Sequence, residues 1–458
     1  MSITSFDEQV IIAQCTPRGP GALALVRLSG INAFTIADNF SQLIGKKKLS
    51  TVDTHTVHYG TLVDENGKTI DIALFIVMQA PHTFTGQNTL EITCHNNQYI
   101  IDHIISRAVQ CGARLAHGGE FSKRAYLNDK IDLMQAEAIH ELIMASSQAA
   151  VKKSLEQLSG SFSAWICTIE KQLLQCVALT EASFEFIDEE ITFQQEVIAI
   201  IEKILVQIIR LKAVFDNQKH LREGIRIALI GSVNAGKSSL FNALLQKERA
   251  IVTPHPGTTR DAIEATIMLN DMPCTLIDTA GFRHTNDTIE RIGIEKAYAE
   301  AEHADIVIIV FDASAQWTAD EATVYYSLMH TYKDKCIIVA NKIDDRITNY
   351  PHIQFNIIDI SCIRNKGIAA LLSAIQKKIV SLFATGDSPF LVNERHYHVL
   401  VRVERLVYEI KGMLMQDPAY ELISCHIRDA LVSLTELTGK TISEKGLNAV
   451  FREFCVGK

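Results

Sequence analysis

A glycine-rich stretch in the middle of the chain has the residue types and spacing of a phosphate-binding loop. In GSVNAGKSS, Gly231, Gly236, Lys237 and Ser238 follow the GxxxxGK[ST] pattern between the apolar run IRIALI and the helical pattern SLFNALL. Glycines let backbone N–H groups approach phosphate oxygens at a helix N-terminus, where the helix dipole favours negative charge. Lys237 is predicted to reach the β- and γ-phosphates and Ser238 to ligate Mg²⁺, although a glycine-rich turn also fits this pattern alone.

Two further motifs, each at the end of an apolar run, indicate guanine as the base. Asp278 begins DTAG, where it is expected close to Mg²⁺, with the Gly281 amide close to the γ-phosphate. Asp344 ends NKID, and its carboxylate can accept hydrogen bonds from N1–H and N2–H₂ of guanine, a pair that adenine lacks. Ser361 and Cys362 stand where GTPases usually carry Ser-Ala, whose backbone also touches the base. The motifs therefore predict GTP and disfavour an ATP-dependent enzyme.

The residues that would activate water are less obvious. Phe282 follows DTAG, where small GTPases usually carry a glutamine that orients water. The loop TPHPGTTRD offers hydroxyls and carbonyls, and its Thr259 is suited to bind Mg²⁺. Downstream, Asp287, Glu290 and Glu295 are carboxylates that could position water, but each also fits a solvated helix face.

Four segments must position these residues. Residues 1–125 alternate β-rich runs with a helix near 98–111, which predicts an α+β domain, and residues 126–222 have the apolar spacing of long helices in a bundle. Short apolar runs alternate with helical segments in residues 223–384, which predicts a parallel sheet covered on both faces. Residues 385–458 return to helix. We expect a multidomain protein in which the α/β domain is inserted into a helical domain.

Composition narrows the class of protein. The chain has 458 residues, 47% of them hydrophobic and 21% charged, as in soluble globular proteins. Acidic residues near the start argue against a signal peptide, and no apolar run approaches the roughly 18 residues of a membrane span. Ten scattered cysteines without a CxxC pair argue against zinc and disulfides and for the cytoplasm. A net charge of −9 gives no overall basic surface for nucleic acid.

The chain ends on REFCVGK, and Cys455 needs an explanation. A lipid-attachment signal fits poorly because Gly457 is not aliphatic and Lys458 is not an accepted final residue. A buried core cysteine is the simple alternative. The preceding TISEKGLNAVFREF predicts an amphipathic helix with Cys455 in its last turn, capped by Thr441 with Glu444 at capping-box spacing. The expected apolar face consists of Leu447, Val450, Phe451 and Phe454.

These motifs together resemble the MnmE (TrmE) family of tRNA modification GTPases. The similarity rests on the P-loop, GTTRD, DTAGFR, ERIGI and the terminal FCVGK, and it extends to AQCTPRGPGALALVRLSG, TFTGQNTLEI and GEFSKRAYLNDKIDLMQAEAI. It covers essentially the whole chain. The resemblance implies an N-terminal folate-binding and dimerisation domain, a central helical bundle, and a Ras-like P-loop G domain inserted into the helical domain.

The resemblance also implies a function. Members of the family are homodimers that form a heterotetramer with the FAD-binding protein MnmG (GidA). Together they add an aminomethyl or carboxymethylaminomethyl group to the wobble uridine of certain tRNAs. The alternative that we weigh is a GTPase switch acting as an RNA or ribosome assembly factor, and the acidic balance of the chain mildly disfavours an autonomous RNA binder.

Site residues follow from the motifs and the resemblance. The expected GTP site consists of Asn234, Ala235, Gly236, Lys237, Ser238, Ser239, Thr253, Thr258, Thr259, Asp278, Thr279, Ala280, Gly281, Asn341, Lys342, Asp344 and Ser361. The family implies K⁺ ligands at Asn234, Thr253, His255 and Thr258, Mg²⁺ ligands at Ser238 and Thr259, and Glu290 as the residue that orients water. A monovalent cation beside the phosphates can stabilise charge as an arginine finger does.

The family's N-terminal domain binds 5-formyltetrahydrofolate or a related tetrahydrofolate, and the matching residues here are Arg27, Glu91, Lys130 and Lys458. Cys455 is expected to serve the modification chemistry, with GTP hydrolysis acting on that site through domain motion. Two departures stand out. GSVN replaces the family's usual Arg-Pro before Asn234, and CHNN replaces GHGG at Cys94–Asn97, where two glycines are lost.

Overall fold

The computed structural model describes residues 9–185, 193–213, 215, 220–221, 224–247, 250–251, 263–279, 298–345, 355–382, 389–416 and 420–457. The chain forms two compact units. Unit 1 consists of Met1–Ile143, Glu156–Val206 and His398–Lys458, and unit 2 of Met144–Leu155 and Gln207–Tyr397. The architecture is mixed α/β and helical, as expected, whereas the domain boundaries at residues 125, 222 and 384 stay predictions.

The N-terminal part of unit 1 is a seven-stranded sheet with the order β3-β4-β5-β6-β2-β1-β7. One face packs on α1 and α2, where Leu28, Phe75 and Ile92 of the strands meet Ile101 and Ile104 of α2. The strands are β1 Ile11–Gln14, β2 Leu23–Ser29, β3 Ser41–Leu43, β4 Thr56–Val63, β5 Thr69–Met78, β6 Thr89–His95 and β7 Arg114–Leu115. The helices are α1 Ala33–Asp38, η1 Leu49–Thr51, α2 Gln98–Gln110 and α3 Glu120–Leu127.

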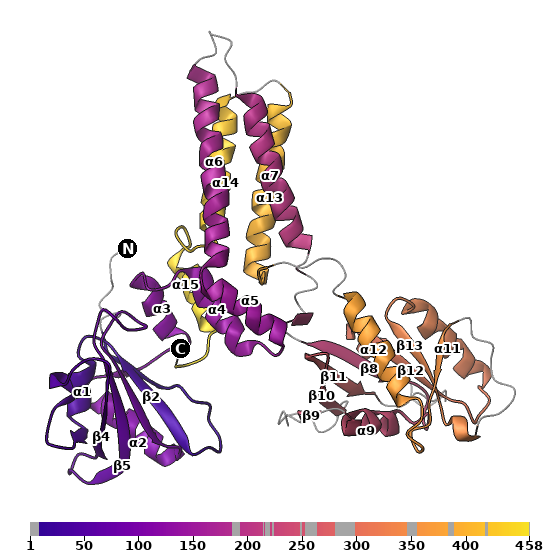
Figure 1. The fold of residues 1–458 in the computed structure, drawn as a ribbon, viewed down its shortest axis with the longest axis horizontal. Coiled ribbons are helices and arrows are strands. Elements are labelled where there is room, and N and C mark those ends of the chain that lie inside the picture. The colour runs from indigo at the N-terminus through magenta and orange to yellow at the C-terminus, as the bar shows by residue number, and fades with distance from the viewer. Residues whose placement is uncertain are drawn as a thin grey trace. The chain divides into compact units, whose positions relative to one another are not determined.

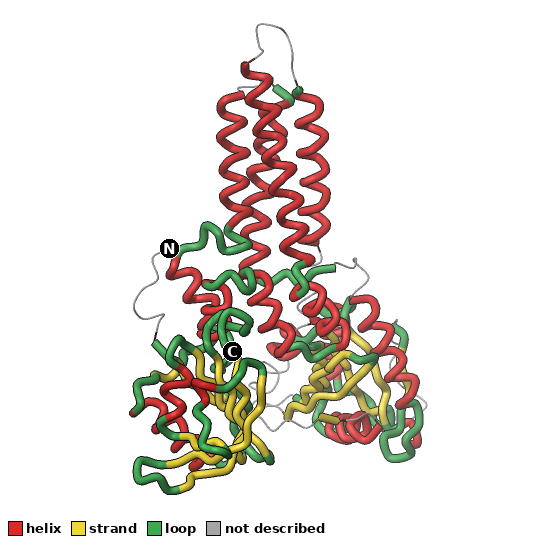
Figure 2. Tube along the Cα trace, turned by 60° about the vertical axis from the view of Figure 1, so that its left-hand side comes forward, coloured by secondary structure: helices red, strands yellow, loops and turns green. Residues whose placement is uncertain are grey.

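Long helices from distant parts of the sequence make most of the rest of unit 1. Figure 1 shows α6 beside α14 and α7 beside α13, and Figure 2 shows that the long helices run side by side. Ion pairs join Glu181 to Arg428 and Glu202 to Lys411. Along the chain, the helices that follow the first sheet are α4 Leu133–Met144, α5 Gln148–Leu158, α6 Ser161–Glu185 and α7 Gln194–Ala213. The helices nearest the C-terminus are α13 Glu394–Leu414, α14 Tyr420–Thr435 and α15 Glu444–Arg452. The apolar run from residue 133 to 158 is two helices, because Ser147 accepts a hydrogen bond from the Ala150 amide and begins a new one.

Unit 2 is built around a second seven-stranded sheet with the order β14-β13-β12-β8-β11-β10-β9. β8, β11, β12, β13 and β14 are parallel, whereas β10 and β9 are antiparallel, so the sheet is mostly parallel, as expected for a Ras-like G domain. The strands are β8 Ile225–Ile230, β9 Ala250–Ile251, β10 Ile263–Leu269, β11 Met272–Asp278, β12 Ile306–Asp312, β13 Cys336–Asn341 and β14 Ile357–Asp359. The helices are α9 Lys237–Lys247, α11 Ala319–Thr331, η3 Ile343–Asp345 and α12 Ile368–Leu382.

Both faces of this second sheet are covered, as the apolar runs predicted. Alternate residues of β8 point to opposite sides: Ile227 joins a core cluster with α9 and α12, and Ala228 joins another with α11. The parallel strands end at one edge of the sheet, which is the edge where ligands bind in open α/β folds. The predicted P-loop and the DTAG and NKID motifs all follow strands at this edge.

The C-terminal helix begins later than expected. Ser443, not Thr441, is its N-cap, and the Ser443 hydroxyl accepts a hydrogen bond from the Gly446 amide at 3.2 Å. Thr441 instead donates to the Val432 carbonyl at 3.2 Å. The helix ends at Arg452, so Cys455 lies beyond the helix rather than in its last turn. The expected apolar face is correct: Leu447, Phe451 and Phe454 are buried against α4, with Val450 partly buried beside them.

Replacing Ser443 by alanine removes this cap. We expect the free energy of unfolding to fall by about 1 kcal/mol, the usual loss for an N-cap hydroxyl, in urea unfolding followed by circular dichroism. Thr441→Ala is the matched control and should cost at most about 0.5 kcal/mol, since its hydroxyl is exposed and does not cap. A larger loss for Thr441→Ala than for Ser443→Ala would show that the cap is assigned to the wrong residue.

Candidate functional site

The loop between β8 and α9 has the backbone that phosphate binding requires. Asn234 has a φ of +65° and Gly236 of +91°, and both values belong to the left-handed region. Gly231 lies so close to the Val310 carbonyl of β12 that a Cβ atom there would collide with it. The Gly236 position is similarly filled by the Asn341 side chain. Glycine at 231 and 236 is therefore a steric requirement.

Lys237 is held under this loop. Its side chain is buried, and Nζ donates to the carbonyls of Gly231 at 2.9 Å and Ser232 at 3.0 Å. Burial lowers the pKa of Lys237 to about 8, although the nearby Asp278 carboxylate opposes this shift. The ammonium group is thus already in place before a ligand binds, and its positive charge is only partly compensated. This favours an anionic ligand such as a triphosphate.

The end of β11 supplies a carboxylate suited to a metal site. Asp278 Oδ1 is buried and has no hydrogen-bond partner among the described residues, which fits a role close to Mg²⁺. Thr279 is not free for a ligand in the same way, because its hydroxyl donates to the Leu229 carbonyl of β8 at 2.6 Å. Ser238, the predicted direct Mg²⁺ ligand, is exposed at the start of α9.

The residues predicted to recognise the base lie together at the ends of β13 and β14. Asn341 Nδ2 donates to the Ala235 carbonyl at 3.0 Å and its Oδ1 accepts from the Cys362 amide at 3.4 Å, so it ties the P-loop to the Ser361–Cys362 turn. Asp344 Oδ1 has no hydrogen-bond partner among the residues described. A hydrogen bond from Ser361 lowers the pKa of Asp344, which keeps it an acceptor for guanine donors.

The sequence analysis missed Asp312 at this edge. Its carboxylate pairs with Lys342 Nζ at 2.5 Å, and Lys342 itself has a φ of +62°. Burial would raise the pKa of Asp312, but the hydrogen bonds from Lys342 and Ser314 lower it overall. Its place directly after the apolar run of β12 was the signal, because the parallel strands end at one edge.

Several predicted site residues lie outside the described parts of the chain. These are Thr253, His255, Thr258, Thr259, Ala280, Gly281, Glu290 and Lys458, together with Phe282 and the potential water-positioning residues Asp287 and Glu295. Ala235 is buried in the P-loop and Ser239 is exposed on α9. Among the described residues, no cluster of three or more His, Cys, Asp or Glu side chains could hold a metal ion.

A second candidate site lies in unit 1, where the C-terminal tail contacts the N-terminal sheet. Arg27 of β2 and Glu91 of β6 are directly opposite in the strand register and form an ion pair at 2.7 Å. Arg27 Nη1 also donates to the Gly457 carbonyl at 3.2 Å, and Cys15 Sγ lies 3.2 Å from the same oxygen. The structure thus brings together two predicted folate residues and the end of the tail.

Glycines make this close docking possible. A Cβ at Gly457 would lie 2.7 Å from the Gln14 carbonyl, and one at Gly118 would lie 2.9 Å from the Phe454 carbonyl. The Gly119 amide donates to the Cys455 carbonyl at 3.2 Å, so the backbone of the tail is anchored while Cys455 itself is exposed. A buried core cysteine is therefore ruled out for Cys455, and its thiol is open to a reactant.

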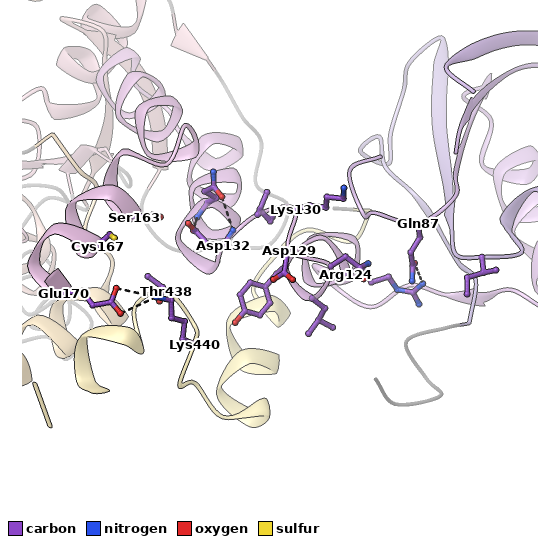
Figure 3. Close-up of a pocket in the computed structure, with 16 residues that line it drawn as sticks. Gln87, Arg124, Asp129, Lys130, Asp132, Ser163, Cys167, Glu170, Thr438 and Lys440 are labelled. Atoms are coloured by element: carbon purple, nitrogen blue, oxygen red, sulfur yellow. Dashed lines mark hydrogen bonds and ion pairs between the residues drawn. The ribbon is translucent and has the colours of Figure 1, made fainter. Parts of the chain in front are cut away.

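Lys130, the remaining described folate candidate, lines a cavity of about 960 Å³ within unit 1 (Figure 3). Neither Arg27 nor Glu91 belongs to its lining, so the structure does not bring Lys130 together with that pair in one pocket. Arg124 and Glu170 are at other parts of its wall, where Arg124 donates to Gln87 and Glu170 pairs with Lys440 (Figure 3).

Asn96 and Asn97, the asparagines of the CHNN stretch, cause no backbone strain. Neither Asn96 nor Asn97 has a positive φ. Asn97 is the N-cap of α2, where its side chain accepts from the Tyr99 amide at 2.9 Å, and Asn96 donates to the Gly19 carbonyl at 2.7 Å. The CHNN departure therefore gives this chain a capped helix and a fixed loop.

Unit 2 contains a guanine-nucleotide-binding domain of the P-loop class. Three features define it: the motifs at the strand ends, the buried Lys237, and the carboxylate oxygens of Asp278 and Asp344 that have no partner among the described residues. The chain matches the family model "MnmE helical domain" over residues 133–455 and "GTP-binding protein TrmE N-terminus" over residues 10–130.

Full-length relatives give the same result. The chain is 36% identical to the tRNA modification GTPase MnmE of Aquifex aeolicus over 98% of this chain and 99% of the relative. It is 34% identical to that of Bacillus subtilis over 98% of this chain and 100% of the relative. The chain therefore belongs to the MnmE family of tRNA modification GTPases, enzymes that hydrolyse GTP in tRNA modification.

Similarity to solved structures is weaker. A structure of a variant of Aquifex aeolicus Era bound to GDP·AlF4⁻ is 24% identical, and the match covers 40% of this chain and 66% of that chain with a TM-score of 0.29.

None of the helices in the described part of the chain has the length and apolar character needed to cross a membrane.

Replacing Asp344 by asparagine should change base selectivity. The amide would offer a donor to guanine N1–H, so we expect GTP affinity to fall by at least about 100-fold while xanthosine triphosphate binds more tightly than GTP. Titration calorimetry with both nucleotides measures this. Asp345→Asn, on the neighbouring exposed side chain, is the control and should leave the preference for GTP unchanged. An unchanged preference in Asp344→Asn would remove Asp344 from the base site.

Proposed function

We propose that this chain is a potassium-stimulated GTPase that works with an FAD-dependent partner protein on tRNA. The two proteins add an aminomethyl or carboxymethylaminomethyl group to the wobble uridine of certain tRNAs. The observation that carries this proposal is the docked C-terminal tail, which presents the exposed Cys455 on a backbone anchored at Gly119 and Gly457. An exposed thiol on an anchored backbone is suited to a second reaction besides GTP hydrolysis.

In this proposal the two sites have separate tasks. In unit 2, Asn234, Thr253, His255 and Thr258 hold K⁺, Ser238 and Thr259 hold Mg²⁺, and Glu290 orients the attacking water. In unit 1, Arg27, Glu91 and Lys458 bind a formyltetrahydrofolate, and Lys130, which lines a separate cavity, is assigned to the same ligand by the family resemblance alone. Cys455 serves the modification chemistry. The side chains of Arg27 and Glu91 are 16% and 18% exposed, so a bound molecule can reach both.

Charge pattern supports the folate assignment. The guanidinium of Arg27 suits a carbonyl or carboxylate of the ligand, and the Glu91 carboxylate suits the amino-amide edge of a pterin. The partners in this proposal are a second copy of the chain, the FAD-binding protein MnmG in a heterotetramer, and tRNA, all in the cytoplasm.

GTP hydrolysis should depend on the monovalent cation. We expect hydrolysis in Na⁺ to be at least about tenfold slower than in K⁺, because K⁺ beside the phosphates stabilises the transferred charge. Asn234→Ala should remove this difference and lower the rate in K⁺ to the rate in Na⁺. Val233→Ala is the control, since Val233 is also exposed in the P-loop and has no cation-binding atom. Equal rates of the unmodified chain in the two salts would refute the cation mechanism.

Cys455→Ser should separate the two activities. We expect GTP hydrolysis by the purified variant to stay within about twofold, while tRNA from cells that carry only this variant has an unmodified wobble uridine by mass spectrometry. Cys425→Ser, at another exposed cysteine in unit 1, should leave both unchanged. Loss of hydrolysis together with modification would contradict separate tasks. Normal modification in cells lacking the whole protein would instead favour an RNA or ribosome assembly factor.

A further inference from the structure

A tyrosine hydroxyl lies behind the phosphate-binding loop. The Ser232 amide N–H donates to the Tyr325 hydroxyl at 2.9 Å. The same hydroxyl lies 3.0 Å from the Val310 carbonyl and 3.1 Å from Ser232 Oγ, either of which can accept its proton. Tyr325 is on α11 and is fully buried. None of the nucleotide motifs in the sequence includes this residue.

The hydroxyl and Lys237 hold the two ends of one peptide group. In a trans peptide, the N–H and the C=O point in opposite directions. The Ser232 N–H belongs to the same peptide as the Gly231 carbonyl, which accepts from Lys237 Nζ at 2.9 Å. Tyr325 therefore fixes the orientation of the carbonyl that positions the phosphate-binding lysine.

Tyr325 also ties the loop to the sheet. Val310 lies on β12, which pairs in parallel with β8, the strand that leads into the loop. Gly231 approaches the same Val310 carbonyl so closely that no side chain fits. The Val310 carbonyl of β12 thus has two roles. It lies against Gly231, the first glycine of the loop, and it fixes the Tyr325 hydroxyl that accepts a hydrogen bond from the Ser232 amide.

The tyrosine side chain is itself well fixed. Its ring stacks on Trp317 with centroids 4.6 Å apart and meets Phe311 edge-on at 6.2 Å. A capping box formed by Thr318 and Glu321 fixes the start of α11, about two turns before Tyr325. Burial raises the pKa of Tyr325 to about 12, so the hydroxyl keeps its proton and remains a donor at physiological pH.

We propose that Tyr325 is a positioning residue of the GTP site, which orients the Gly231–Ser232 peptide for Lys237 before a nucleotide binds. Ser232 and Val233 of this loop are not prolines, so no ring constrains φ at either residue. Tyr325 restricts the loop by a tertiary hydrogen bond instead. This inference rests on GTP binding at the P-loop and does not involve K⁺, folate or tRNA.

Tyr325→Phe tests the hydroxyl while keeping the ring. In the full chain, we expect the Kd for GDP and for GTP to rise by a similar factor, about 5- to 30-fold, as loss of one buried hydrogen bond implies. The turnover rate at saturating GTP should stay within about twofold, because Tyr325 acts on the shape of the binding loop. Tyr326→Phe is the matched control: it removes a hydroxyl from the next residue of α11, whose side chain is 44% exposed, and should change neither quantity.

Amide hydrogen exchange gives an independent test, and its first measurement, in the nucleotide-free, unmutated chain, does not require the variant to fold. The Ser232 amide should exchange more slowly than the amides of Val233 and Asn234, and in Tyr325→Phe it should exchange at their rate. The proposal is overturned by equal nucleotide affinities in the two tyrosine variants, by a fall in turnover without a change in Kd, or by a Ser232 amide that exchanges as fast as its neighbours in the unmutated chain.

Discussion

The buried ammonium group of Lys237 is the constraint on which the nucleotide site depends. A charge taken out of water costs free energy unless acceptors surround it, and here two backbone carbonyls of the loop do so. Those carbonyls point to Lys237 only if the loop turns back over α9. That turn requires the positive φ at Asn234 and Gly236 and the close approach of Gly231 to β12. Burial lowers the pKa of Lys237 to about 8. Negatively charged triphosphate oxygens beside the ammonium group would raise this pKa again and so favour its charged form.

The same site shows how a sheet edge gathers chemistry from separate segments. Asp278, Asp312 and Asn341 each end a parallel strand, and the parallel register places them at one edge. Asn341 then joins the phosphate and base ends, because its amide contacts both Ala235 and Cys362. Recognition of the base and of the phosphates is therefore mechanically connected through one side chain.

The C-terminal tail follows a different principle, in which glycine allows backbone to meet backbone. Gly118, Gly119 and Gly457 leave room for carbonyl oxygens that any side chain would displace. The tail is consequently held by its main chain, and its exposed cysteine side chain does not contribute to the docking. Arg27 takes part in both the tail contact and the ion pair with Glu91, so tail and sheet share one charged group.

Local patterns predicted the elements well where periodicity is strong. β8, β12 and β13 follow the continuous apolar runs, and α2 and α7 follow the helical spacing. The errors concern helix ends. Thr441 and Ser443 are both good capping residues, and a single sequence does not show which hydroxyl faces a free amide. The helix break at Ser147 has no clear signal in the sequence, because its neighbours keep the apolar spacing across it.

The sequence by itself determined the order of the GTP motifs, the strands that carry them and the family, because these depend on residue types at short, fixed spacings. Only the tertiary structure decided that Tyr325 holds the Ser232 amide, 93 positions away, and that Arg27 holds Gly457, 430 positions away. Such contacts arise from packing between elements that lie far apart along the chain. No local propensity specifies which distant hydroxyl or guanidinium will meet a particular backbone group.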